Sequence, residues 1–460
     1  MGPKPFSLYS PDTARLVRKE LTHLEAHHGI LDILPTTATQ NFFLTQWSLT
    51  GYCCMLHGSI DVNRLQAACR AVVHRHSILR TVFTRLSEGG FVQVILKTAE
   101  PTLEHRLVID ERLEDVCAST VEKMITETAP TIGQPLVRFM LVSRSDKEHA
   151  LLIRISHAQY DGNTSPILFR DISAAYNSNQ NDCCSGMNLL PAAAPFQRYL
   201  YARNKNRAFP DDDPAIQFWR QNLQGASMTT LTPALGNGTG NSEPETRIIT
   251  TPVSGSLPTV FDNITVPTLL NAACSLLLAD VVGKNDVILG NVMDTRGAVA
   301  FPGIENTLGP FLNINPLRVR LEGRGSTTFA ALCHSLSEQY AQVTRHAAAW
   351  DLPDIVEHCT DWPADTQMGC IINHLRPETG PLPLALDGVA CMSLEKSVQL
   401  HLPPQLLFRC IAGRDRLEVQ VLTSAALMDR ASATRLAERL VAAALALSEA
   451  PGTLLADIRV

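Results

Sequence analysis

Residues 151–172 read LLIRISHAQYDGNTSPILFRDI. The stretch starts as a near-continuous apolar run, which predicts a buried β-strand. The chain then becomes polar, with His157 at the end of the strand and Asp161 four residues later. A Ser-Pro pair at 165–166 indicates the start of a helix, because proline is favoured in the first turn of a helix. The stretch therefore predicts a strand, a short loop that carries a histidine and an aspartate, and a helix.

The spacing His-x-x-x-Asp does not decide the function, because it occurs three times in the chain. His28 precedes Asp32 in a polar helical stretch, which favours a solvated surface histidine. His57 precedes Asp61, but Asp61 is explained as the N-cap of a helix, so we expect a structural role for that pair. The third pair follows a buried strand and precedes Gly162. On spacing alone it is equally compatible with a core histidine bonded to a carboxylate and with a functional histidine.

A functional histidine at position 157 has a clear chemical use. A neutral imidazole can accept a proton from a nitrogen or oxygen nucleophile while that atom bonds to an acyl carbon, which accelerates a reaction by ~10²–10⁴-fold. We expect Asp161 to point away from the substrate and to lock the loop, and Gly162 to allow a turn and a close approach of substrate to the backbone. A buried aspartate requires a cation. Arg296 in GNVMDTRG is the candidate, and such a pair would connect the two halves of the chain.

Length and composition indicate a folded globular protein of two lobes. The chain has 460 residues, of which 45% are hydrophobic and 18% charged. A formal charge of -6 without a basic block argues against binding to nucleic acid. No apolar run reaches membrane-spanning length, and the N-terminus lacks the apolar segment of a signal peptide. We therefore expect a cytoplasmic protein that binds no membrane.

The cysteines and histidines do not indicate a metal site or a disulfide framework. Most of the twelve cysteines lie in apolar stretches, as Cys274 does, and the chain has no C-x-x-C. We interpret them as reduced thiols that pack like small apolar residues. Neither H-E-x-x-H nor a Cys/His cluster occurs, so no metal is expected. A Ser-His-Asp hydrolase is not favoured, because no G-x-S-x-G elbow surrounds a serine.

Alternating strand and helix patterns predict an α/β fold with two lobes. We expect an N-terminal lobe at 1–176 that carries the histidine loop, a polar link at 177–205 and a C-terminal lobe at 206–460. The expected strands are 51–60, 135–144, 149–156, 286–293, 315–323 and 368–375, with a hairpin at 406–424 that turns at 413–415. The expected helices are 62–80, 165–176, 267–284, 327–348 and 424–450.

The histidine loop is one of several motifs that resemble the condensation domains of nonribosomal peptide synthetases, within the wider chloramphenicol-acetyltransferase-like superfamily. SHAQYDG is similar to the family motif H-H-x-x-x-D-G, with Ser156 in place of the first histidine. Further likenesses follow in the family's order along nearly the whole chain. They are TATQNFFL at 37–44, RHSILRTVF at 75–83, DVILGNVMDTRG at 286–297, NTLGPFLNINPLRV at 306–319, AAAWDLPDIVEH at 347–358 and GCIINHL at 369–375.

The serine resembles a variant found in terminal condensation-like (CT) domains of fungal synthetases, S-H-x-x-x-D-x-x-S/T. Ser156, His157, Asp161 and Thr164 match it. The resemblance implies an α/β (α+β) fold of two chloramphenicol-acetyltransferase-like lobes in a V-shaped pseudodimer, with His157 midway along a central tunnel. It also implies a domain that stands last in its synthetase and releases the peptide by macrocyclisation. The likeness extends to synthetases that make fumiquinazoline-type cyclic tripeptides.

The same resemblance implies the roles of the site residues. His157 is expected to be catalytic, while Gly162 and nearby helix-terminal amides bind the developing oxyanion. Ser156 is expected to bond backbone beside the loop, and Asn313 and Asn373 to support the tunnel. The expected partner is an upstream peptidyl carrier protein whose 4'-phosphopantetheine bears the peptidyl thioester. We expect a monomer with no cofactor of its own.

Four alternatives remain, three of them enzymes and one a binding protein. An ordinary condensation domain would form an amide between two separate substrates, and an epimerisation domain would need a second acid or base. A plant-type CoA-dependent acyltransferase would carry D-F-G-W-G late in the chain, where LGPFLN stands here. A non-catalytic platform that only docks carrier proteins would tolerate the loss of His157.

Overall fold

The strand expected at 149–156 is β7 (Glu148–Ser156), the central strand of a five-stranded sheet in the order β12-β2-β7-β6-β5. Its neighbours β2 (Ser48–His57) and β6 (Arg138–Ser143) run antiparallel to it. The edges are β5 (Leu103–Leu107), parallel to β6, and β12 (Ala390–Gln399), antiparallel to β2. Strand β7 is buried almost throughout, which explains its near-continuous apolar sequence.

The computed structural model describes most of the chain. The described residues are 5–86, 90–126, 133–178, 190–204, 211–231, 248–347, 350–375, 383–399, 405–413, 415–425 and 427–459. Several residues of expected elements lie outside them: 179–189 and 205 of the link, with Cys183 and Cys184 among them, 348 and 426 of the helices expected at 327–348 and 424–450, and 414 of the hairpin turn.

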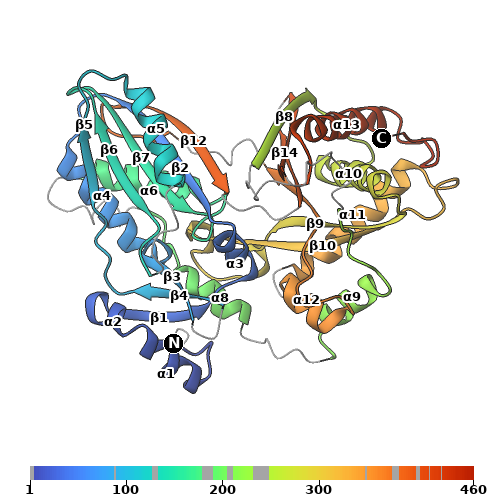
Figure 1. The fold of residues 1–460 in the computed structure, drawn as a ribbon, viewed down its shortest axis with the longest axis horizontal. Helices are drawn as coiled ribbons and strands as arrows, with labels where there is room; N and C mark the ends of the chain where they lie inside the picture. The colour runs from blue at the N-terminus through green and yellow to red at the C-terminus, as the bar shows by residue number, and fades with distance from the viewer. Residues whose placement is uncertain are drawn as a thin grey trace. The chain divides into compact units, whose positions relative to one another are not determined.

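Helices cover both faces of the five-stranded sheet (Figure 1). Helix α5 (Leu113–Thr126) packs on one face in a core that includes Leu152 of β7. Helices α4 (Val62–Arg75) and α6 (Ser165–Asn177) pack together on the other face. The side chain of Asp61 accepts a hydrogen bond from the Arg64 amide and caps α4, as expected from the sequence. Because β7 is covered on both faces, its residues are buried apart from the first, and His157 follows its C-terminal end.

A second sheet has three strands in the order β1-β4-β3. Its apolar side is closed by the N-terminal helices in a separate core cluster. The elements of this part are α1 (Pro11–Glu20), α2 (Thr22–His28), β1 (Ile30–Pro35), α3 (Ala38–Thr45), η1 (Ser77–Arg80), β3 (Thr81–Arg85), β4 (Phe91–Leu96) and α8 (Phe196–Asn204).

The chain divides into two compact units, and the division differs from the expected one. Unit 1 comprises Met1–Asn206, Val299–Phe311 and Thr379–Gln399; unit 2 comprises Arg207–Ala298, Leu312–Glu378 and Leu400–Val460. The sequence-based division placed all of 206–460 in the second lobe. Two of its segments instead join unit 1, because β12 hydrogen bonds along the whole of β2 and because the backbone of Phe311 binds Asp161.

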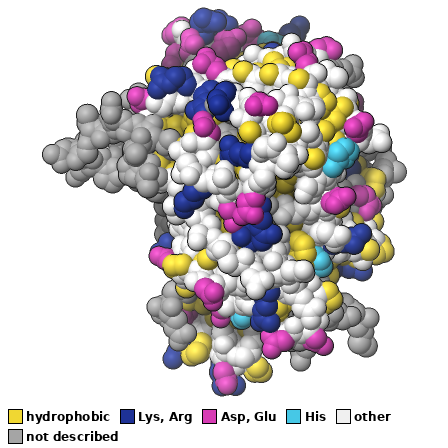
Figure 2. Space-filling view, turned by 90° about the vertical axis from the view of Figure 1, so that its right-hand side faces the viewer, with side chains coloured by type: hydrophobic (Ala, Val, Ile, Leu, Met, Phe, Trp, Pro, Cys, Tyr) yellow, Lys and Arg dark blue, Asp and Glu magenta, His cyan; other side chains and the backbone are white. Residues whose placement is uncertain are grey.

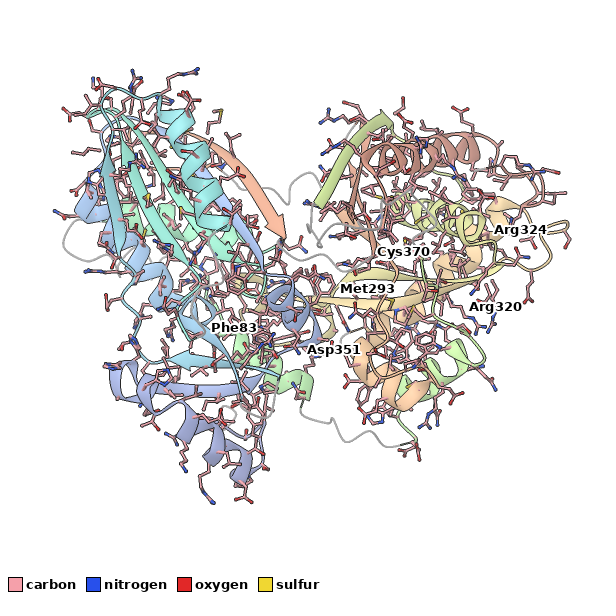
Figure 3. All side chains as sticks on the ribbon, viewed as in Figure 1. Phe83, Met293, Arg320, Arg324, Asp351 and Cys370 are labelled. Carbon is pink, nitrogen blue, oxygen red and sulfur yellow. The ribbon has the colours of Figure 1, made fainter. Side chains whose placement is uncertain are left out.

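Unit 2 is built on a six-stranded mixed sheet with helices packed against it (Figure 1). Met293 and Cys370, labelled in Figure 3, are buried on neighbouring strands β9 and β11. The strand order is β10 (Leu312–Arg320), β9 (Asp286–Asp294), β11 (Cys370–Leu375), β13 (Leu406–Ala412), β14 (Arg416–Ser424) and β8 (Ile248–Ser256). The helices are α9 (Pro214–Leu223), α10 (Val266–Val282), α11 (Phe329–His346), α12 (Leu352–Cys359) and α13 (Arg430–Glu449).

The cysteines that the structure describes are free thiols, and most are buried. Cys274 on α10 and Cys410 on β13 belong to the main core of unit 2. Burial raises the pKa of Cys410 well above its ordinary value, so this thiol stays protonated and inert. The buried cysteines among the described residues therefore behave as small core side chains, whereas Cys359 and Cys391 are half-buried.

Candidate functional site

The loop that carries His157 begins with two contacts to β2. The backbone amide of His157 donates to the carbonyl of Ser48 at 3.1 Å. The hydroxyl of Ser156 also lies 3.4 Å from that carbonyl and accepts from the Ala158 amide at 3.2 Å. Ser156 is 2% exposed and bonds only backbone in these contacts, which is the structural role expected for it. The chain therefore leaves the sheet at a fixed point immediately before the histidine.

The imidazole of His157 stacks against two aromatic rings. Its centroid lies 4.6 Å from that of Tyr160, with an angle of 16° between the planes. The ring of Phe43 on α3 lies at 4.8 Å and 25°. The Tyr160 hydroxyl donates to Thr50 Oγ1 at 2.7 Å and lies 3.4 Å from His157 Nε2. His157 itself is only partly buried, so the ring is held by neighbours and still reaches the surface of its unit.

Asp161 ties the loop to two other segments of unit 1. Its carboxylate is 1% exposed and accepts from the Thr164 amide at 2.9 Å and from the Phe311 amide at 2.7 Å. The Asp161 amide donates to Thr164 Oγ1 at 2.9 Å, and that hydroxyl lies 3.3 Å from the carbonyl of Gly309. Through these contacts Asp161 fixes the loop, and Thr164 is its partner at the start of α6. The expected partner cation, Arg296, belongs to unit 2, and the Asp161–Arg296 pair stays a prediction.

The start of α6 does not offer the amides that were expected to bind an oxyanion. The amides of Thr164 and Ser165 both donate to the backbone carbonyl of Asp161, at 3.0 and 3.2 Å. Gly162 lies outside the left-handed region that the sequence allowed for it. The expectation that the helix-terminal amides bind an oxyanion is wrong, because they already donate hydrogen bonds to Asp161. Among the amides that were expected to bind the oxyanion, the Gly162 backbone amide forms no hydrogen bond with the described residues.

Gln40 also holds the loop, a role that the sequence interpretation missed. Its Nε2 donates to the carbonyl of Ala158 at 3.0 Å, and it is paired with Gln93. The Gln40 side-chain oxygen also accepts from the Thr37 backbone amide at 3.0 Å, while the Gln40 backbone amide donates to Thr37 Oγ1. This reciprocal pair is a capping box at the start of α3, and a Thr-x-x-Gln pattern is its sequence signature. The signal was therefore present at 37–40, although its link to position 158 depends on the fold.

We expect Gln40→Leu to slow the reaction at His157 by about tenfold to a hundredfold, because small displacements of a reacting group are costly. The substitution removes the donor that fixes the residue next to His157 and leaves a buried carbonyl unpaired, which costs about 1–3 kcal/mol of stability. Single-turnover release and urea unfolding measure the two effects. Gln66→Leu is the matched control. Gln66 lies on α4, and its side-chain amide donates to the carbonyl of Pro101 instead of to the His157 loop. If both variants slow release equally, Gln40 has no specific role.

The first two residues of the segment RHSILR at 75–80 belong to a buried ionic network around Asp171. Asp171 on α6 is 0% exposed, and its Oδ2 accepts from Arg75 Nε at 2.9 Å and His76 Nε2 at 2.8 Å. Arg170 binds Oδ1 at 2.8 Å and also donates to Asn306 Oδ1. Burial would raise the pKa of Asp171, but the hydrogen bond from His76 and the nearby cations hold it below its ordinary value. The network joins α4, α6 and the 299–311 segment that supports Asp161.

The other two His-x-x-x-Asp pairs have structural surroundings. His28 and His57 are both exposed. Asp32 is buried, and its carboxylate accepts from the Phe6 and Ile33 amides and from the Tyr201 hydroxyl. Neither pair therefore presents a buried strand end with a supported imidazole, as His157 does.

The two asparagines expected at the tunnel lie in unit 2. Asn313 is 3% exposed and its Nδ2 donates to the carbonyls of Ala347 and Trp350 at 2.6 and 2.8 Å, so it braces the chain between α11 and α12. Asn373 is half-buried on β11, beyond Ile372, where the pairing of that strand with β9 ends. Asn313 is thus a bracing residue, and a supporting role for Asn373 stays a prediction.

A buried polar network beside Asn373 was not found from the sequence. His374 Nε2 lies 2.8 Å from Asn271 Oδ1, which also accepts from Asn291 Nδ2 at 3.0 Å. Because the shared oxygen is an acceptor, His374 donates to it through Nε2. Burial lowers the pKa of His374 to about 4. These three side chains come from β11, α10 and β9, which no local sequence pattern connects.

His374 predicts a loss of stability in mild acid. Since its folded pKa of about 4 is below the ordinary value, the unfolded chain takes up a proton first. The stability from this neutral imidazole is complete above pH about 6.5 and is lost as the pH falls toward about 4. Between about pH 7.5 and about pH 5, wild type should therefore lose more stability to urea than His374→Gln, which cannot be protonated. His28→Gln should behave as wild type, and equal losses in all three would contradict the assignment.

A family comparison decides what kind of domain this is. The family described as "Condensation domain" matches residues 37–373, which include the Thr-x-x-Gln segment, the His157 loop and β11. The chain belongs to the condensation domain family. The condensation domain is 33% identical to nonribosomal peptide synthetase penN of Penicillium thymicola over 99% of its length, and 33% identical to nonribosomal peptide synthetase fmqA of Aspergillus fumigatus over 95%. It spans 16% and 10% of those two proteins.

Solved structures confirm the fold class of this condensation domain. "The crystal structure of holo T3CT" and "The crystal structure of CT" each align with it at a TM-score of 0.86 and 30% identity, over 99% of this chain and 100% of theirs. The X-domain from teicoplanin biosynthesis aligns at 0.75 with 22% identity and shares the fold. The family and the α/β two-lobe fold expected from the motifs are therefore both confirmed.

No helix among the described residues is long and apolar enough to span a membrane. Nor do three potential metal-binding side chains gather anywhere in those residues. On the face shown in Figure 2, basic and acidic side chains are interspersed.

Proposed function

We propose that this condensation domain releases a linear peptide from a carrier protein by cyclising it. The peptide's own N-terminal amine attacks the carbonyl of the thioester, and a cyclic peptide leaves. The single observation that carries the proposal is the partly exposed imidazole of His157, fixed at the end of β7 by contacts to β2, α3 and the 309–311 segment. The likeness to the CT structures and the pattern Ser156, His157, Asp161, Thr164 support cyclisation over other reactions of the family.

The reaction balances without any group that the protein must hold permanently. The amine nitrogen forms a bond to the thioester carbon, and the carbon–sulfur bond breaks. His157 takes the proton that the amine loses, or holds the amine in line, and the proton ends on the departing thiol. Base catalysis contributes ~10²–10⁴-fold. Holding both ends of one peptide together lowers the barrier by a further ~7–11 kcal/mol.

The partner in this proposal is an upstream peptidyl carrier protein. Its 4'-phosphopantetheine arm presents the peptidyl thioester, so the arm is part of the substrate and is no cofactor of this chain. A linear tripeptide is the proposed first substrate, because the sequence likeness extends to synthetases that make fumiquinazoline-type cyclic tripeptides. The domain acts as a monomer in this scheme.

The proposal is tested by the mass of the released product. A carrier protein is loaded with a linear tripeptidyl-phosphopantetheine, the domain is added, and the released peptide is measured. We expect a product that is one water lighter than the linear acid. The same peptide with an acetylated N-terminus should stay on the carrier. Release of the linear acid, or transfer only to a second amine added in solution, would overturn cyclisation; the second result would favour an ordinary condensation domain. No release at all would favour a docking platform.

A further inference from the structure

Two aromatic rings enclose the imidazole of His157. Phe43 and Tyr160 lie 4.8 and 4.6 Å from it, and both planes are within 25° of the imidazole plane. Two rings so close and so nearly parallel would collide on one face of an imidazole. They therefore occupy opposite faces, and only the edge of the imidazole remains open to a reactant.

We propose that Phe43 and Tyr160 are positioning residues that hold the His157 imidazole in one plane and stabilise it while it carries the amine's proton. The inference rests on the proposed function, because it deepens the role of the same histidine. The face of an aromatic ring is electron-rich and attracts a cation within about 6 Å of its centroid. Both rings satisfy this distance, so the imidazolium formed during the reaction gains attraction on both faces.

Each ring is fixed by its own contacts, so the arrangement is built rather than accidental. Tyr160 is 2% exposed and its hydroxyl donates to Thr50 Oγ1 on β2 at 2.7 Å. Phe43 is 9% exposed and lies on α3, the helix whose Gln40 binds the carbonyl of Ala158. The Tyr160 ring cannot turn aside without breaking its hydrogen bond to Thr50, and the Phe43 ring is buried on a helix that is bonded to the loop. The imidazole is therefore confined between two anchored walls from different elements.

Few other ionisable groups on the surrounding elements compete with this effect. Helix α3, Ala38–Thr45, carries no charged or titratable side chain. On β2, Tyr52 packs edge-on against Tyr160 at 6.1 Å. On the loop itself, the Asp161 carboxylate is bound by the amides of Thr164 and Phe311. The groups that stack directly on the imidazole are therefore the uncharged rings of Phe43 and Tyr160.

The effect of the ring can be separated from the effect of the hydroxyl. Tyr160→Phe keeps the aromatic face and removes the hydroxyl, whereas Tyr160→Leu removes the face. Phe43→Leu removes the other face. If the rings stabilise the cation, losing one lowers the pH at which His157 titrates. If they only exclude water, losing one raises it, because burial disfavours the charged form.

The test is an NMR titration of the domain with ¹³C-labelled histidine. The His157 Cε1 resonance is assigned from its absence in His157→Ala. We expect its titration midpoint to fall by about one pH unit in Phe43→Leu and in Tyr160→Leu and to hold in Tyr160→Phe. A rise or no change in the two leucine variants would overturn the proposal. In wild type, the His157 Cε1 proton should also be shifted upfield by the stacked rings; an unshifted proton would overturn it even if the variants do not fold.

Activity separates this inference from the proposed function. In steady-state release with excess loaded carrier protein, the leucine variants should lower kcat about tenfold or more with little change in KM, because they act on the proton transfer and leave substrate binding intact. The acidic limb of the pH profile should move with the NMR midpoint. If the midpoint falls as expected while His157→Ala still releases cyclic product, the proposed function fails and the ring assignment stands. If His157→Ala is inactive while the midpoint rises or holds, the ring assignment fails and the proposed function stands.

Discussion

His157→Ala should release cyclic peptide about 10²–10⁴-fold more slowly than wild type, because the variant loses the base that takes the amine's proton. The fold should be retained, since Ser156 and Asp161 hold the loop through backbone contacts that do not involve the imidazole. Single-turnover release from a loaded carrier protein measures the rate, and urea unfolding with circular dichroism checks the fold.

The matched control for this variant is His57→Ala. His57 has the same spacing to an aspartate and ends strand β2, but it is exposed and its aspartate caps a helix. We expect this control to release product at the wild-type rate. A His157→Ala variant with an unaltered rate would remove the imidazole from the mechanism, and a His57→Ala variant with a strong loss would show that the spacing was assigned to the wrong pair.

Asp171→Ala should be the most destabilising single change discussed, by about 3–5 kcal/mol, because it leaves the largely buried Arg75 guanidinium and the buried His76 imidazole without their shared acceptor. Arg75, His76 and Arg170 all bind the Asp171 carboxylate, which is 0% exposed. Without the Asp171 carboxylate, the guanidinium groups of Arg75 and Arg170 lose their buried partner, and α4 loses this polar link to α6. Urea unfolding at neutral pH measures the loss.

The control for the ionic network is Asp12→Ala. Asp12 pairs with Arg15 on α1, but the two side chains are 84% and 79% exposed, and such surface pairs contribute about 0–1 kcal/mol. We therefore expect nearly wild-type stability for this variant. Equal losses in Asp12→Ala and Asp171→Ala would contradict the role assigned to the buried network.

The features that could be predicted from the sequence are those set by local pattern. The continuous apolar run before His157 identified β7, Asp61 identified the start of α4, and the ordered set of motifs identified the family. The helix expected at 62–80 is shorter, because α4 ends at Arg75 and η1 follows. Arg80 donates to the carbonyls of Val73 and His74 at the end of α4, a contact that depends on the turn.

The features that could not be predicted depend on contacts between distant parts of the chain. Strand β12 pairs with β2, although Ser393 and Cys54 are 339 residues apart, and no alternation in one strand reveals its partner. The rings of Phe43 and Tyr160 meet His157 only because α3 and the loop pack together. The expectation that the helix-terminal amides bind the oxyanion was wrong for a related reason. The sequence shows the start of a helix, but it does not show that Asp161 already binds the amides there.

The isotopic composition of the released product tests the central claim most directly. Two batches of carrier protein are loaded with the same linear tripeptide, one labelled fully with ¹³C and ¹⁵N and one unlabelled, and are mixed in equal amounts before the domain is added. Attack of a peptide's own amine at His157 predicts a cyclic product in two forms only, fully labelled and unlabelled. A product that joins labelled and unlabelled peptides would show attack between separate chains and would contradict the proposed reaction.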